Sequence, residues 1–221
     1  MNKTSFRLAA VLCALGAASQ AQAVGVTFTG FAHGSESVNY SLNSGSTSTA
    51  VSAGGFTTLI QGGGPSFTSY CVDLAETISF GTLYTGYTSV GAGHVFANAD
   101  AYADLGRLYA VAGPILDSAH EAAFQIAVWE IAYETTPTYG LGTGSARFFG
   151  GSADPSALGF AATWLTAVGS ASGGPSVNVL DRQGSQDVIY APVPEPSTIA
   201  LMFAGFVGLA AVARRRKAER A

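Results

Sequence analysis

The stretch that most constrains the fold is residues 118–133, SAHEAAFQIAVWEIAY, whose apolar spacing is typical of one helix. Ser118 and Glu121 have the spacing of a capping box, in which each side chain satisfies a backbone N–H of the first turn. We therefore expect the helix to begin at Ser118. At about 100° per residue, Glu130 and Glu134 lie roughly 140° and 180° around the helix from Gln125, so they are expected to mark the solvent side.

Gln125 is then predicted to point inward, on the same face as Val128, Trp129 and Ala132. A buried carboxamide without hydrogen-bond partners would cost about 1 to 3 kcal/mol. The sequence therefore predicts that another group either hydrogen-bonds Gln125 or is bonded to it. A loop backbone is the ordinary candidate.

The first 23 residues have the three parts of a secretory signal peptide: the basic residues Lys3 and Arg7, an apolar run over 8–18, and Ala-Gln-Ala at 21–23. Export through the Sec pathway is predicted. Cys13 would leave with this segment, so Cys71 would be the single cysteine of the exported chain. Such a cysteine is buried and inert, free and reactive, or bonded to something other than sulfur.

The C-terminal segment, residues 193–221, also has three parts. Val193, Pro194, Glu195 and Pro196 precede an apolar run, predicted as a transmembrane helix over 197–213, and a basic cluster follows at Arg214, Arg215, Arg216 and Lys217. The basic cluster is expected to stay cytoplasmic, which places residues 24–196 outside the membrane.

This tripartite tail resembles the PEP-CTERM sorting signal. The resemblance implies recognition by an exosortase, a membrane-embedded enzyme proposed to cut near the Pro-Glu-Pro motif, and a Gram-negative host that makes exopolysaccharide. The protein would then pass through a membrane-anchored intermediate to the cell surface or extracellular matrix. A permanent single-span anchor is the alternative.

Residues 24–192 have the length of one domain, and their charge is strongly acidic. They hold twelve acidic residues against Arg107, Arg147 and Arg182, which gives a net charge of −9, and no lysine occurs between Val24 and Pro196. This balance argues against nucleic acid and anionic lipid as partners.

The domain is predicted to be α+β, an antiparallel sheet or sandwich with a helical insertion. Short alternating runs predict strands at 24–28, 38–42, 56–60, 67–74, 177–180 and 188–190 and a strand or hairpin at 78–90, whereas 43–55 and 135–151 are expected to be loops. Helices are predicted over 97–112, 118–133 and 154–168, the last capped by Asp154 with Pro155 at its first position. In the strand at 67–74, Cys71 is expected to face away from the more apolar side.

Several chemical motifs are incomplete. His120-Glu121-Ala122-Ala123-Phe124 begins like a zincin helix, but Phe124 stands where the second metal-binding histidine would be. The glycines of 140–144 lack the spacing of a dinucleotide loop. With three histidines and one retained cysteine, no metal site and no cofactor are predicted.

Tyr70-Cys71-Val72-Asp73 and, 54 residues after the cysteine, Gln125-Ile126-Ala127-Val128-Trp129 resemble the two signatures of bacterial thioester domains, over about residues 67–135. Phe124 stands where that family usually has threonine. The resemblance implies a bond between the Cys71 thiol and the Gln125 carbonyl, with loss of ammonia. Tyr70 and Trp129 would shield the bond, and Asp73, Glu121, His94 or His120 would assist proton transfer.

Three functions stay open. The first is a surface or matrix protein that attaches covalently to a nucleophile on a polysaccharide or surface protein through a Cys71–Gln125 thioester. The second is a noncovalent structural or glycan-binding component of the exopolysaccharide matrix. The third is a hydrolase or acyltransferase that uses Cys71 with a histidine base. Of these, the sequence favours a self-modifying protein that is not an enzyme.

Overall fold

The strand signals at both ends of the domain meet in one closed antiparallel barrel. In this computed structural model, which describes residues 23–43, 45, 47–91, 93–150, 155–192 and 205–206, the barrel order is β1-β4-β5-β9-β8-β6. The strands are β1 (Val24–Phe31), β4 (Phe56–Ile60), β5 (Phe67–Cys71), β6 (Leu83–Val90), β8 (Asn178–Asp181) and β9 (Val188–Tyr190).

The antiparallel sheet closes into a barrel, which the predicted sheet or sandwich did not include. The short hairpin of β8 and β9 lies between β5 and β6, pairing Cys71 with Val188 and Val90 with Val179, and so removes both sheet edges. Nothing local in either strand indicates this closure. Inside the barrel, Phe28 packs edge-on against Phe56 and Tyr87, with ring centroids 5.5 and 6.0 Å apart.

A second, three-stranded sheet was missed at the sequence level. Its order is β3-β2-β7, formed by β2 (Glu36–Leu42), β3 (Thr49–Ala53) and β7 (Ala146–Phe149). Both β3 and β7 fall in stretches predicted to be loops. They become strands because β2 offers partners on both edges, as in the pairs Val38–Val51 and Tyr40–Phe148.

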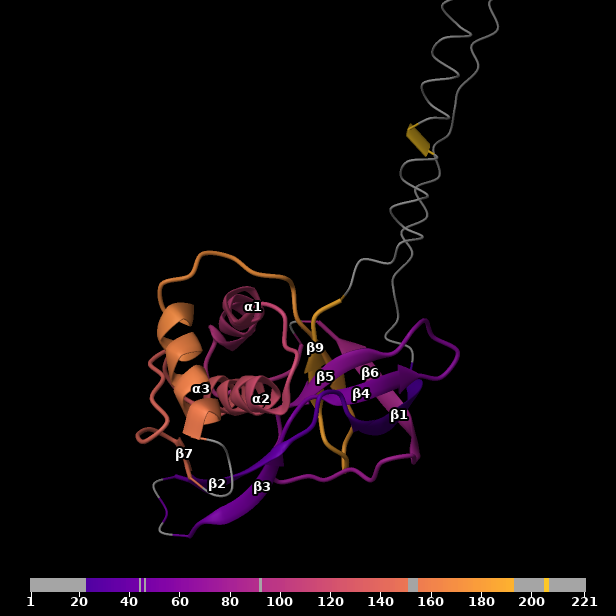
Figure 1. Cartoon of the computed structure of the whole chain (residues 1–221). Helices are drawn as coiled ribbons and strands as arrows, with labels where there is room; N and C mark the ends of the chain where they lie inside the picture. Colours follow the sequence, from indigo (N-terminus) through magenta and orange to yellow (C-terminus); the bar gives the residue numbers. More distant parts are fainter. Residues whose placement is uncertain are drawn as a thin grey trace, which may run out of the picture.

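The helices lie between β6 and β8 in the chain, as the predicted insertion requires: α1 (Ala101–Ala112), α2 (Ser118–Tyr133) and α3 (Pro155–Val168). Figure 1 shows them grouped on one side of the barrel. Helix α1 starts later than expected because the Asn98 side chain accepts the backbone N–H of Asp100 and donates to the carbonyls of Ile131 and Glu134. The predicted cap Asp154 lies outside the described residues.

Helix α2 is enclosed on all sides, since it packs against α1, α3, β2, β3, β5 and β7. The predicted solvent side is therefore wrong: Glu130 is fully buried and Glu134 nearly so. The predicted capping box is also wrong. Asp117 caps the helix by accepting the His120 backbone N–H at 2.8 Å, and Glu121 turns inward.

Among the described residues, no helix combines the length and the apolar character needed to cross a membrane. The predicted transmembrane helix over 197–213 lies outside these residues except for 205 and 206. Residues 1–22 of the predicted signal peptide 1–23 also lie outside them, as do the motif Val193, Pro194, Glu195 and Pro196 and the basic cluster 214–217.

Candidate functional site

The site predicted from the two signatures forms where α2 crosses the end of β5. Cys71 is the last residue of β5, and Gln125 lies in the middle of α2. The Oε1 atom of Gln125 accepts the backbone N–H of Cys71 at 3.0 Å, and its Nε2 atom donates to the Cys71 carbonyl at 2.7 Å. The inward orientation of Gln125 and its need for partners are thus confirmed, and the partner is the main chain of Cys71.

The Cys71 thiol is buried, so the prediction that it faces away from the apolar side is wrong. Ser69, Tyr70, Cys71 and Val72 are all buried because α2 covers one face of β5 and the barrel interior covers the other. The Cys71 Sγ donates to the carbonyl of Asp73 at 2.8 Å. Burial raises the pKa of Cys71 to about 12, so the thiol is protonated at neutral pH.

Trp129 lies beside this thiol. Its indole N–H is buried and has no hydrogen-bond partner among the described residues, yet it is near enough to Cys71 to lower the thiol pKa against the larger effect of burial. Trp129 itself is almost fully buried and stacks on Phe148, with centroids 6.0 Å apart. This placement fits the predicted shielding role, and the role stays a prediction.

Tyr70 points to a different neighbourhood. Its ring packs against Phe124 and Tyr109, with centroids 4.4 and 6.3 Å away. Burial, together with the nearby Glu121 carboxylate, raises the pKa of Tyr70 far above its ordinary value. Phe124, which stands where the resembling family has threonine, is thus a packing residue of the Tyr70 cluster.

Glu121 is occupied by structural contacts. One carboxylate oxygen lies 2.7 Å from Nδ1 of His33, and the other accepts the backbone N–H of Gly55 at 3.0 Å. Its predicted part in proton transfer stays a prediction, and the structure gives it a second role in tying α2 to the turns that flank β2 and β3.

Asp73 follows β5 at the edge of a small cavity. Its Oδ1 accepts the Ala75 backbone N–H at 2.7 Å and the Tyr133 hydroxyl at 3.4 Å. The cavity, of about 260 Å³, is lined by Val72, Asp73, His94, Val95, Phe96, Ala97, Ala132, Tyr133 and Asp187. Its wall includes Val72 and Asp73, the two residues that follow Cys71 in the chain.

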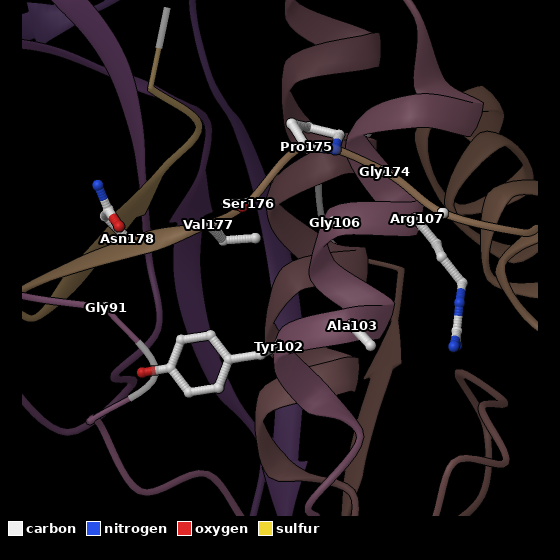
Figure 2. A pocket seen from close by; sticks show the side chains of 11 residues that line it. Gly91, Tyr102, Ala103, Gly106, Arg107, Gly174, Pro175, Ser176, Val177 and Asn178 are labelled. Carbon is white, nitrogen blue, oxygen red and sulfur yellow. The ribbon is translucent and has the colours of Figure 1, made fainter.

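A larger cavity lies elsewhere. It measures about 480 Å³ and lies between α1 and residues 173–178, where Figure 2 shows Tyr102 and Arg107 extending from opposite sides of the helix. Arg107 forms an ion pair with Asp104. No residue lines both this cavity and the one beside Cys71, so size alone does not locate the chemistry predicted from the sequence.

The three histidines each pair with a carboxylate. His33 pairs with Glu121, His120 with Asp117, and His94 lies 3.2 Å from Asp181 and 3.7 Å from Asp187. No imidazole among the described residues is hydrogen-bonded to Cys71. A histidine-activated thiol therefore has no support in this geometry.

Two features of the site were missed at the sequence level. Tyr133, the last residue of the predicted helix, donates to Asp73 and accepts the Leu74 backbone N–H at 2.9 Å. Asp187 belongs to the cavity wall although it lies 116 residues after Cys71. Spacing along α2 places Tyr133 eight residues beyond Gln125, about 80° around the helix at about 100° per residue, whereas Asp187 has no local signal.

Comparison with known proteins identifies the tail. The PEP-CTERM protein-sorting motif matches residues 192–217. No curated protein and no solved structure matches the chain. The motif supports an exosortase substrate that is exported, passes through a membrane-associated intermediate and reaches the cell surface. The resemblance to thioester domains gains no support from these comparisons.

Proposed function

We propose that this surface-sorted protein forms an internal thioester between Cys71 and Gln125 and attaches through it to a nucleophile on a polysaccharide or surface protein. The observation that carries the proposal is the pair of hydrogen bonds, 3.0 and 2.7 Å long, that holds the Gln125 carboxamide against Cys71. These bonds bring together the two residues whose side chains would react, although 54 positions separate them in the sequence.

The reaction is balanced without a cofactor. The Cys71 sulfur attacks the Gln125 carboxamide carbon, the C–N bond breaks, and the thiol proton leaves with the amide nitrogen as ammonia. An incoming amine or hydroxyl then attacks the same carbon, and Cys71 regains its proton and leaves as a thiol. Each chain reacts once, so the protein modifies itself and is not an enzyme.

Burial acts on this chemistry in two directions. It excludes water, which protects an activated acyl group from hydrolysis. It also raises the pKa of Cys71 to about 12, which opposes the first step because the thiolate is the attacking form. The Trp129 indole N–H acts against burial by lowering that pKa, and it would stabilise negative charge on sulfur when the bond forms or breaks.

Two further observations fit a reactive acyl group. The cavity lined by Val72, Asp73 and Tyr133 borders the two residues after Cys71, so a partner that entered it would lie close to the proposed bond. The exported residues 24–192 contain no lysine, which removes the strongest internal competitor for the thioester.

The same hydrogen bonds favour a second candidate, a noncovalent component of the extracellular matrix. They satisfy the buried amide of Gln125 without any covalent change. In that case Cys71 is a small buried side chain, consistent with its raised pKa.

The deciding experiment is the intact mass of residues 24–192 before and after exposure to methylamine. A thioester gives a species one ammonia lighter than the sequence mass, which gains one methylamine and then exposes a free thiol. The Cys71→Ser variant keeps its full mass and forms no adduct. A wild-type protein of full mass with a free thiol from the start rejects the thioester and leaves the matrix component, which polysaccharide binding would then test.

A further inference from the structure

Three side chains from separate chain segments, His94, Asp181 and Asp187, come together next to the cavity beside Cys71, and His94 and Asp187 line that cavity. His94 comes from the connection between β6 and α1, Asp181 is the last residue of β8, and Asp187 directly precedes β9. Their candidate donor atoms all lie within 4.8 Å of one another. The shortest approaches run from the His94 Nδ1 to the Oδ2 atoms of Asp181 and Asp187, at 3.2 and 3.7 Å.

We propose that His94, Asp181 and Asp187 bind one divalent transition-metal ion of the zinc type. Zinc bonds to nitrogen and oxygen ligands are about 2.0 to 2.2 Å long, so atoms around one ion lie up to roughly 4 Å apart. The two separations from the His94 Nδ1, 3.2 and 3.7 Å, match this spacing, and the donor atoms of Asp181 and Asp187 lie within 4.8 Å of each other. An imidazole with two carboxylates favours zinc over calcium or magnesium, which prefer oxygen ligands throughout.

The ligand atoms are held in place by their own contacts. The Oδ1 of Asp187 accepts the Arg182 backbone N–H at 2.8 Å, which leaves Oδ2 directed at His94. The His94 backbone N–H donates to the Tyr102 hydroxyl at 2.8 Å, and its ring packs against Phe96 with centroids 4.7 Å apart. Such supporting contacts are typical of metal ligands, because they fix the orientation of the donor atom.

Arg182, the basic residue next to Asp181 in the chain, has its guanidinium bound to groups other than the two carboxylates. The Nε of Arg182 donates to the Thr85 carbonyl at 2.8 Å, and its guanidinium carbon lies 5.6 Å from the centre of the Tyr84 ring. Among the described residues, the His94 imidazole is therefore the basic side chain that lies within 4 Å of both carboxylates. A bound dication would offset the repulsion between the two carboxylates, and the adjoining cavity, lined by His94 and Asp187, leaves room for water at the remaining coordination positions.

The ion would hold the barrel closed. Asp181 and Asp187 flank the turn between β8 and β9, the hairpin that completes the barrel, and His94 would link this hairpin to the segment after β6. The Asp187 carbonyl also accepts the Val72 backbone N–H at 3.0 Å, one residue from Cys71. Metal binding would thus stabilise the strand pairing beside Cys71, whether or not a thioester forms there.

The test uses the full chain, purified in detergent from membranes, treated with a chelator and titrated with zinc chloride. Calorimetry and native mass spectrometry are expected to show one zinc ion per chain and a higher melting temperature with zinc. The His94→Gln and Asp181→Asn variants should each lose roughly tenfold or more in affinity. The matched control is His120→Gln, because His120 and Asp117 form a similar pair, 2.7 Å apart, that has no third candidate ligand within the described part of the chain.

Circular dichroism without metal separates loss of the site from loss of the fold. If His94→Gln is unfolded, the Asp181→Asn variant decides, since the Asp181 side chain is 42% exposed and its replacement removes charge without changing shape. Equal zinc affinity in wild type and Asp181→Asn would overturn the proposal. So would the absence of stoichiometric binding to the wild-type chain, or an equal loss of affinity in His120→Gln.

Discussion

Glu121 and His33 form a 2.7 Å contact between α2 and the turn after β1, across 88 residues of sequence. The second oxygen of Glu121 accepts the Gly55 backbone N–H. One buried carboxylate therefore contacts both the segment that precedes β2 and the segment that follows β3. The side chain is fully buried, whereas that of His33 is 42% exposed. Of the two contacts of Glu121, the one with Gly55 is therefore expected to contribute more to the free energy of unfolding than the one with His33.

Replacing Glu121 by alanine should lower the free energy of unfolding by about 1 to 3 kcal/mol, since it leaves the buried Gly55 N–H without an acceptor. His33→Ala should cost less than about 1 kcal/mol, as for other solvent-exposed pairs. Urea denaturation of the two variants measures the difference. Equal losses would show that the imidazole contact, and not the Gly55 contact, holds the hairpin.

Glu130 gives the domain a pH-dependent stability. Burial, followed by the nearby Glu134, raises the pKa of Glu130 to about 7, although one of its oxygens accepts the Gly140 backbone N–H at 2.7 Å. The folded protein therefore holds a proton that the unfolded chain releases near the ordinary glutamate pKa. Between that value and about 7 the folded state binds more protons, so stability falls as pH rises and levels off above about pH 7.

The Glu130→Gln variant should lack this contribution. From about pH 5 to about pH 8, the wild type is expected to lose roughly 1 to 3 kcal/mol of unfolding free energy relative to the variant. Denaturation curves of both proteins at the two pH values measure this difference. A constant difference between the curves would show that Glu130 does not titrate in this range.

The carboxylates of α2 show where sequence reasoning failed. Charge normally marks the solvent side of a helix, but α2 is enclosed, and its acids accept backbone N–H groups of loops: Glu130 from Gly140, and Glu134 from Ser145 and Ala146. A helix that is apolar all around its axis is typical of a buried one, and this signal was present. The loop N–H groups that donate to these carboxylates could not be predicted, since the loops have no pattern of their own.

Local pattern was sufficient for the inward face of Gln125 and for most strands and helices. It was insufficient for β3 and β7, whose pairing with β2 decides their conformation, and for the closure of the barrel by β8 and β9. The Cys71–Gln125 contact was predicted because both residues lie in recognisable signatures. The cluster of His94, Asp181 and Asp187 was not, because only the tertiary fold brings its members together.

Two helical glycines should respond in opposite ways to alanine. A Cβ atom on Gly106 of α1 would lie 2.6 Å from the Pro175 carbonyl oxygen, a backbone atom that cannot move away alone. Gly106→Ala should therefore destabilise the fold by about 1 to 3 kcal/mol. Gly159 of α3 has open space around it, so Gly159→Ala should stabilise by about 0.5 to 1 kcal/mol through helix propensity. Thermal melts compare them, and a gain in both would show that α1 and residues 173–175 do not pack this closely.

Alanine replacements of Cys71 and Gln125 should differ in how much they lower the free energy of unfolding. In the noncovalent case, Gln125→Ala leaves the buried N–H and C=O of Cys71 without their side-chain partner and should cost about 2 to 4 kcal/mol. Cys71→Ala keeps both main-chain groups and their bonds to Gln125. It should cost only about 1 kcal/mol, for the lost sulfur contacts.

A thioester changes this comparison. It closes a loop between residues 54 positions apart, and the chain-entropy relation for a crosslink of that size gives about 4 kcal/mol. Either variant then removes the whole crosslink, so the loss in Cys71→Ala should rise from about 1 to roughly 5 kcal/mol. Urea denaturation of wild type, both variants and methylamine-treated wild type measures these values. With a thioester, methylamine treatment should also remove the crosslink contribution; without one, it should leave the wild-type curve unchanged, and Gln125→Ala should be the less stable variant.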